Sequence, residues 1–163
     1  TGQGRRGRGF LWLGAIALLA GLTALFNAID SGRNGSAGMI QSSPSGVVLQ
    51  RDRSGHFTAT GQINGIDVDF MVDTGATDVA VSESLARELG LEFGPQVRVM
   101  TAAGPVIAWM TRLDEVRLGG LYLRDVRGTI TRSPMNDVLL GMSFLRHFSL
   151  SQQGDELVIE VGS

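Results

Sequence analysis

An uncharged stretch of twenty residues, 10–29, divides the chain into a short basic tail and a longer polar remainder. Its length matches what a helix needs to cross the hydrocarbon core of a bilayer. The stretch offers no polar face to solvent, which makes a buried helix of a globular core the poorer interpretation. We therefore predict a transmembrane anchor at 10–29.

Charges on either side of this stretch indicate its orientation. Three arginines lie in the basic tail, 1–9, and Asp30 follows the stretch. By the positive-inside bias, the tail stays in the cytoplasm and everything after Asp30 is exported. A cleaved signal peptide is the alternative. We favour an uncleaved anchor because the nearest candidate cleavage pattern begins with the bulky Phe26.

The next segment, 30–46, consists largely of Gly, Ser, Asn and Pro, and this composition predicts a flexible linker. From residue 41 onward the chain has ten arginines and fifteen acidic residues, so nucleic acid is not the expected partner. The chain has no Cys and no Lys, which excludes thiolate metal sites, cysteine nucleophiles and Schiff-base chemistry. Its two histidines, His56 and His147, are far apart in sequence, and we expect neither a metal nor a cofactor.

The remainder of the chain predicts a mainly β domain with short helices. Asn64-Gly65 between two alternating runs is a strong hairpin signal, because both residues tolerate positive φ. Ser82 can cap a helix, and Gly90 can end it. The predicted strands are 56–63, 66–72, 97–101, 106–111, 112–118, 121–126, 127–131, 138–140 and 157–161, and the predicted helices are 83–89 and 142–148.

One motif carries reactive chemistry. Asp73 ends an apolar strand and is followed by Thr74 and Gly75, a context that holds a carboxylate at a rigid, partly dry position. An aspartate in an ordinary turn is the simpler alternative. A second element, Val138-Leu139-Leu140-Gly141 before a short helix, accompanies the motif further along the chain.

These features resemble the retropepsin-like aspartic proteases, and among them the membrane-anchored bacterial members. The resemblance covers 47–161. It rests on the Asp73-Thr74-Gly75-Ala76 motif, on a hairpin at Ala103-Gly104 in the place of a flap, and on Gly141 before a C-terminal helix. It implies a single-lobe acid protease fold over 47–163, preceded by the transmembrane helix.

The resemblance also implies roles for individual residues. Asp73 would be catalytic within the Asp73-Thr74-Gly75 motif, and Thr74 would lock two active-site loops together. The residues that would border the substrate are Ala76, Thr77, Asp78, Ala103 and Gly104. The chain departs from the retroviral pattern by having Thr77 where an aspartate is usual. It also has Pro105 in the flap, which lacks an N–H for a bridging water.

Peptide hydrolysis of this type needs two carboxylates that share one proton. The chain contains one Asp-Thr-Gly and no internal repeat, and about 115 residues are too few for two lobes. We therefore predict a twofold homodimer in which Asp73 meets its symmetry mate. Confinement of both copies to one membrane would raise their effective concentration. We expect 157–161 to contribute a strand to the dimer sheet.

Together these inferences predict an aspartic endopeptidase that acts on protein or peptide substrates. Its location would be the bacterial inner membrane, with the protease domain in the periplasm. Two alternatives stay open at this point. The first is a non-catalytic dimerisation or peptide-binding module of the same fold, and the second is a protease that cuts only itself or one dedicated partner.

Overall fold

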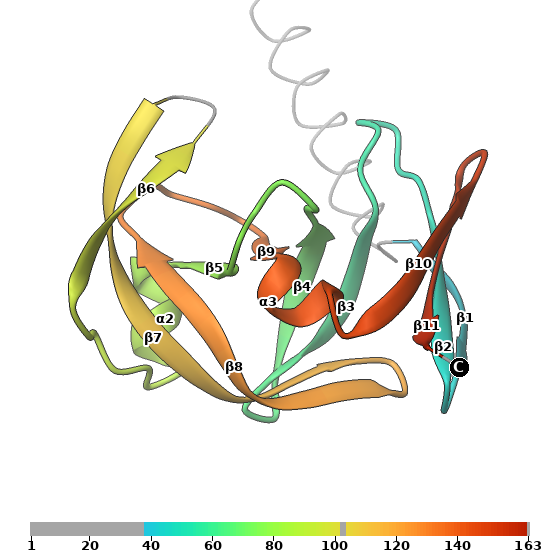
Figure 1. Ribbon diagram of the computed structural model, residues 1–163, viewed down its shortest axis with the longest axis horizontal. Helices are drawn as coiled ribbons and strands as arrows, with labels where there is room; N and C mark the ends of the chain where they lie inside the picture. The colour runs from blue at the N-terminus through green and yellow to red at the C-terminus, as the bar shows by residue number, and fades with distance from the viewer. Residues whose placement is uncertain (1–37, 102–103, 163) are drawn as a thin grey trace, which may run out of the picture. The chain divides into compact units, whose positions relative to one another are not determined.

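The computed structural model of the chain describes residues 38–101 and 104–162 (Figure 1). The expected anchor at 10–29 and residue Ala103 of the predicted flap lie outside the described residues. Within them, neither helix has the length and apolar character that a membrane crossing requires. These helices are α2, Glu83–Glu88, and α3, Met142–Leu145.

The larger of two sheets has seven strands in the order β3-β4-β9-β5-β8-β7-β6, and β7 also pairs with β3. The sheet therefore curves back on itself around the core. Its strands are β3 Thr58–Ile63, β4 Ile66–Val72, β5 Val79–Ser82, β6 Gln96–Thr101, β7 Gly104–Leu118, β8 Leu121–Thr131 and β9 Val138–Leu140.

The smaller sheet has four strands in the order β1-β2-β11-β10. It joins the two ends of the described chain, which lie beside each other at one side of the molecule (Figure 1). Its strands are β1 Met39–Ser43, β2 Gly46–Gln50, β10 Phe148–Gln153 and β11 Glu156–Val161.

The predicted first hairpin is confirmed. Asn64 and Gly65 both adopt positive φ, 52° and 79°, between β3 and β4. Along β4, Val68 and Phe70 are buried. Asp67 and Asp69 point outward and accept hydrogen bonds of 2.8 Å from side chains of β3. This alternation fixes which face of β4 enters the core, and it delivers the chain to Asp73 in a defined register.

One hydrophobic cluster unites the two sheets and both helices. Both sheets bury large side chains in it, Leu49 and Ile159 from the four-stranded sheet and Phe70 from the seven-stranded one. Phe144 of α3 is fully buried in the same cluster. The loop that carries the Asp-Thr-Gly motif is therefore attached to a single continuous core.

The structure corrects several expectations about secondary structure. The linker predicted over 30–46 is too long, because β1 begins at Met39 and pairs with β2. The helix predicted over 142–148 ends at Leu145, and Phe148 already begins β10. The breaks expected after Thr111 and Val126 do not occur, since β7 and β8 each run through them.

The expectation that 157–161 supplies a strand to a dimer sheet is wrong for this fold. This segment belongs to β11, which pairs with β10 on one side and with β2 on the other. Both of its backbone edges are occupied, so no strand of a second copy can add to it. The edges of the four-stranded sheet are β1 and β10.

Candidate active site

Asp73 lies directly after β4, at the point where this strand runs parallel to β9. Its N–H donates to the Leu140 carbonyl at 3.2 Å. Its Oδ1 accepts a 2.9 Å hydrogen bond from the Gly75 N–H. A Cβ at Gly75 would come within 3.1 Å of that oxygen, so glycine suits this tight turn. Within the described residues Oδ2 has no hydrogen-bond partner, which leaves it free to bind water.

Gly141 forms the support behind the motif loop, 73–78. A Cβ at this position would collide with the Asp78 carbonyl oxygen and lie 2.8 Å from that of Ala76. The next two N–H groups, of Met142 and Ser143, donate to the Ala76 and Thr77 carbonyls, each at 2.8 Å. The turn between β9 and α3 therefore holds the loop through its backbone, and only glycine fits at the closest contact.

Ser143 connects three elements beneath the same loop. Its hydroxyl accepts from the Val79 N–H of β5 at 3.0 Å and donates to the Arg127 carbonyl of β8 at 2.7 Å. The side chain is buried. Our sequence reasoning did not identify this residue, although it is the single hydroxyl in the otherwise apolar helix Met142–Leu145. A lone polar residue in an apolar helix was the available signal.

The structure directs the Asp78 carboxylate to Arg127 rather than to the open side of the loop. Arg127 Nε donates to Asp78 Oδ1 at 2.6 Å, and the aspartate side chain is only 12% exposed. Ala76 has both backbone groups engaged, since its N–H donates to the Asp73 carbonyl at 3.1 Å and its carbonyl accepts from Met142. Ala76 therefore has no free N–H to offer a substrate, and its methyl group and the second lone pair of its carbonyl oxygen remain available.

Thr74, Gly75 and Thr77 are the exposed residues of this loop, and the two threonines carry its exposed hydroxyl groups. Neither side chain forms a hydrogen bond within the part of the chain that the structure describes. Thr74 is thus free to contact another loop, as expected from its position in the motif. No such contact is formed among residues 38–101 and 104–162.

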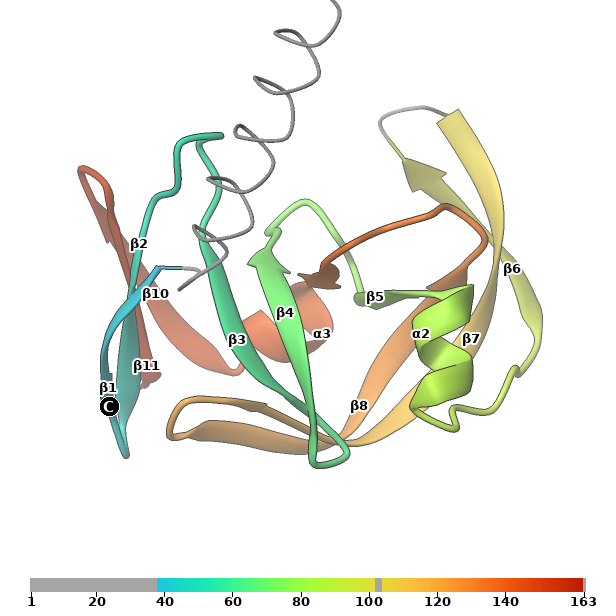
Figure 2. The same ribbon diagram turned by 180° about the vertical axis from the view of Figure 1, so that it is seen from behind.

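The predicted second hairpin is present as β6 and β7, with Thr101 opposite Gly104. Gly104 has a φ of 112°, and the Thr101 hydroxyl donates to its carbonyl at 2.7 Å. The hairpin and the motif loop project to the same side of the molecule in both views (Figures 1 and 2). Near its tip, Met100 is 79% exposed and Ile107 is 46% exposed.

Aromatic contacts fix the base of this hairpin. Trp109 of β7 packs edge-to-face against Phe93, with ring centroids 5.5 Å apart. The guanidinium of Arg132 lies 5.0 Å from the centroid of the Trp109 ring. Because the base is held and the tip is exposed, bending of the hairpin would be confined to its outer part.

A separate group of carboxylates surrounds the loop before β9. Burial raises the pKa of Asp137, and the nearby charges of Asp69 and Asp52 raise it further, against a smaller lowering by His56. Burial also acts to raise the pKa of Asp52, but hydrogen bonds from the Ser54 hydroxyl and from the backbone N–H groups of Ser54 and His56 lower it overall. Among the described residues, no three His, Asp or Glu side chains are arranged to hold a metal ion.

This arrangement defines a class of protein: a mainly β lobe in which two adjacent parallel strands present an Asp-Thr-Gly loop beneath a hairpin. The family model described as gag-polyprotein putative aspartyl protease matches residues 59–147. The chain therefore belongs to this family of retropepsin-like aspartic proteases.

Individual relatives agree with this assignment. An uncharacterised protein from Sinorhizobium is 36% identical over 116 residues, which cover 68% of this chain and 50% of the relative. An uncharacterised protein from Rickettsia prowazekii is 29% identical over 116 residues, 69% of this chain and 50% of the relative. The chain thus spans about half the length of these curated relatives.

Comparison with a solved structure shows that the similarity includes the fold. The crystal structure of a retropepsin-like aspartic protease from Rickettsia conorii superimposes with a TM-score of 0.61 at 28% identity. The match covers 71% of this chain and 91% of that one. The mainly β retropepsin-like fold with few short helices, expected from the sequence, is confirmed.

Proposed function

We propose that the protein hydrolyses peptide bonds in protein or peptide substrates as a homodimer, with Asp73 of both copies activating one water. The observation that carries this proposal is the state of Asp73. One carboxylate oxygen is fixed by the Gly75 N–H, and the other has no partner among the described residues. The chain supplies this motif once.

The chemistry requires the second copy. An ionised carboxylate takes a proton from water while the oxygen of that water attacks the scissile carbonyl carbon, and a protonated carboxylate gives its proton to the carbonyl oxygen. Collapse of the tetrahedral intermediate breaks the C–N bond and returns a proton to the amine. Two adjacent carboxylates that share one proton provide both roles. No covalent enzyme intermediate forms.

Two features of the loop support this assembly. Gly141 and the N–H groups after it hold the loop from behind, so Asp73 can keep its position when another chain approaches. Thr74 is exposed beside it and is available to lock the loop of the second copy. The apolar side chains of Met100 and Ile107 at the hairpin would contact hydrophobic substrate side chains.

We also propose that this dimer works at a membrane surface. The basic tail and the uncharged run 10–29 support an anchor in the bacterial inner membrane with the protease domain in the periplasm. Confinement to two dimensions would favour the meeting of two copies without any additional contact. The dimer contact itself cannot use β11, because β2 and β10 occupy both of its edges.

The test is cleavage of a peptide library by the full chain, read by mass spectrometry. Asp73→Asn is expected to lower the cleavage rate about a thousandfold or more. Asp67→Asn is the matched control, because Asp67 is an exposed aspartate of the same β4 region. Turnover that persists in Asp73→Asn would refute the catalytic assignment.

Mixing experiments test the dimer separately. When wild-type and Asp73→Asn chains are mixed equally and fully paired, random pairing leaves about one dimer in four with two aspartates, so about a quarter of the activity remains. A chain that acted alone would retain about half. Specific activity should also fall steeply on dilution.

The alternative of a non-catalytic peptide-binding module has one observation in its favour. Pro105 lies opposite Met100 at the hairpin tip and has no N–H to hold a water or a substrate carbonyl. Peptide binding without cleavage, unchanged in Asp73→Asn, would identify that function. Cleavage of the chain itself or of one partner alone would instead indicate a dedicated protease.

A further inference from the structure

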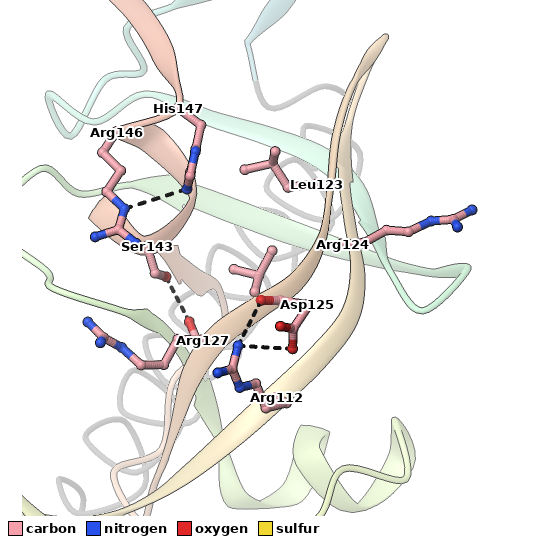
Figure 3. A pocket seen from close by; sticks show the side chains of 9 residues that line it. Arg112, Leu123, Arg124, Asp125, Arg127, Ser143, Arg146 and His147 are labelled. Atoms are coloured by element: carbon pink, nitrogen blue, oxygen red, sulfur yellow. Dashed lines mark hydrogen bonds and ion pairs between the residues drawn. The ribbon is translucent and has the colours of Figure 1, made fainter.

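A second concave site lies between α3 and the β7–β8 hairpin (Figure 3). It is a cavity of about 280 Å³ whose lining includes Arg112, Arg127, Ser143, Arg146 and His147. The reacting group Asp73 does not line it. The cavity therefore belongs to a different part of the fold from the open side of the motif loop.

Positive charge is concentrated in this cavity. Between residue 41 and the end the chain has ten arginines and fifteen acidic residues, a mildly acidic balance. Four of these arginines line the cavity, and Asp125 is the one carboxylate in its lining. Arg127 and Arg124 also pair with carboxylates outside the lining, those of Asp78 and Glu115, so the excess positive charge is that of Arg146. A basic cavity on an acidic domain attracts anions selectively.

Arg146 is the arginine of this cavity whose positive charge has no carboxylate partner among the described residues. Within the described residues no carboxylate lies within salt-bridge distance of it, and its Nε contacts only His147 Nε2, at 3.5 Å. Figure 3 shows these two side chains next to each other above Ser143. A guanidinium with unused donors at the rim of a cavity can bind an incoming anion.

Arg112 can act as a second ligand beside Arg146, and giving up its present ion pair would cost little stability. Its ion pair with the Asp125 carboxylate is 2.9 Å long and it also donates to the Asp125 carbonyl at 3.0 Å, but the two side chains are 63% and 76% exposed (Figure 3). Exposed pairs of this kind contribute little to stability, so the guanidinium can turn toward a ligand. Arg127 also lines the cavity, but its guanidinium is paired with the Asp78 carboxylate at 2.6 Å, so we do not count it as a ligand. Arg124 extends away from the other arginines in Figure 3, so we do not count it as a ligand.

We propose that this cavity binds a phosphate group. The donors of Arg146 and Arg112 together exceed what the Asp125 carboxylate accepts, and the free oxygens of a phosphate group can accept them, whether it is a monoester with nearly two charges or a phospholipid diester with one. The group could be borne by a soluble phosphate or by the headgroup of an anionic phospholipid. This inference does not depend on the proposed protease activity.

Titration of the full chain tests the site and separates the two sources. The chain is held in nanodiscs of phosphatidylcholine and titrated with inorganic phosphate and with glycerol phosphate, while arginine Nε–H resonances are followed by NMR. A second sample uses nanodiscs that contain phosphatidylglycerol. Arg146→Gln and Arg112→Gln remove the proposed ligands. Arg53→Gln, an exposed arginine that does not line the cavity, is the matched control.

The expected result is saturable binding that shifts the resonances of Arg112 and Arg146. Binding should weaken about tenfold in either variant, as for loss of one charge-assisted hydrogen bond, and should stay unchanged in Arg53→Gln. Shifts only with phosphatidylglycerol would assign the lipid headgroup as the source. Absence of binding in every sample, or equal binding by Arg146→Gln and Arg53→Gln, would overturn the proposal.

Discussion

Replacing Ser143 by alanine isolates the support beneath the motif loop, because it removes one oxygen and leaves the backbone path unchanged. The hydroxyl forms two hydrogen bonds, of 3.0 Å from the Val79 N–H and 2.7 Å to the Arg127 carbonyl. The side chain is only 6% exposed, so water cannot simply replace it. The variant therefore leaves two buried backbone groups without this partner.

The magnitude follows from these two groups. An unsatisfied buried polar group costs about 1–3 kcal/mol. The Arg127 carbonyl has a second lone pair and falls at the lower end of that range, so we expect the free energy of unfolding to drop by about 2–4 kcal/mol. With a urea m-value of about 2 kcal/mol/M, the unfolding midpoint would fall by about 1–2 M.

Urea unfolding of the full chain in a mild detergent, followed by tryptophan fluorescence, measures this shift. Ser151→Ala is the control, since Ser151 is exposed on β10 and should change stability by less than about 0.5 kcal/mol. The reasoning is wrong if the two variants unfold at the same urea concentration. A fall in cleavage activity beyond the fraction unfolded would show that the loop geometry also depends on this hydroxyl.

Three further predictions concern the same loop and its surroundings. Gly141→Ala forces a Cβ into carbonyl oxygens of the loop and should lower stability by about 2 kcal/mol or more and abolish cleavage. Gly162→Ala, with no neighbour closer than 3.5 Å, should do neither in a thermal-shift and cleavage assay. A double-mutant cycle of Asp78→Asn and Arg127→Gln should give a coupling energy of about 1 kcal/mol by urea unfolding, and strict additivity would contradict an energetic role for the ion pair. Because folding raises the pKa of Asp137, stability should decrease as the pH rises above the ordinary value of 3.8. Asp137→Asn should therefore melt higher than wild type at pH 7 and equally at pH 3, and a lower melting temperature at pH 7 would refute the sign.

Local turn and capping chemistry made part of the fold predictable from sequence. The Asn64-Gly65 hairpin formed as expected because both residues accept positive φ. Ser82 caps α2 by accepting from the Leu85 N–H at 3.4 Å, and Gly90 ends the helical segment with a φ of 66°. In each case the determining contacts lie within a few residues of one another.

The strands that sequence reasoning missed are β1, β2, β5 and β10, each of four to six residues. β1 is mostly polar and is defined by its pairing with β2. β10 begins with the alternating run 148–151, but our predicted helix 142–148 ran into its first residue. β2 and β5 are short apolar strands whose partners lie far along the chain, β11 for β2 and β8 for β5. A polar segment such as β1 is predicted as a linker unless the strand with which it pairs is known. The same limit explains why 157–161 was expected to pair in a dimer sheet rather than with β2 and β10 of its own chain.

Within the candidate site, the sequence predicted that Asp73 follows a buried strand. It did not predict which groups the side chains of Asp78 and Ser143 contact. The motif fixes an aspartate after a buried strand through local geometry. The Asp78 contact to Arg127 spans 49 residues, and the Ser143 contact to Val79 spans 64. Such pairings follow from the order of β9, β5 and β8 in the sheet, which the sequence pattern alone does not specify.

The four-stranded sheet has a consequence for how folding relates to assembly. Because β11 finds both of its neighbours inside one polypeptide, a newly made chain needs no exchange of strands with another to reach its native state. Each chain can then fold before it meets a partner, and the melting temperature should rise with protein concentration only as far as association of folded copies stabilises them by mass action. For the proposed dimer, catalytic output would then depend on encounters between chains that are already folded, so the local concentration of folded copies would set the rate of proteolysis.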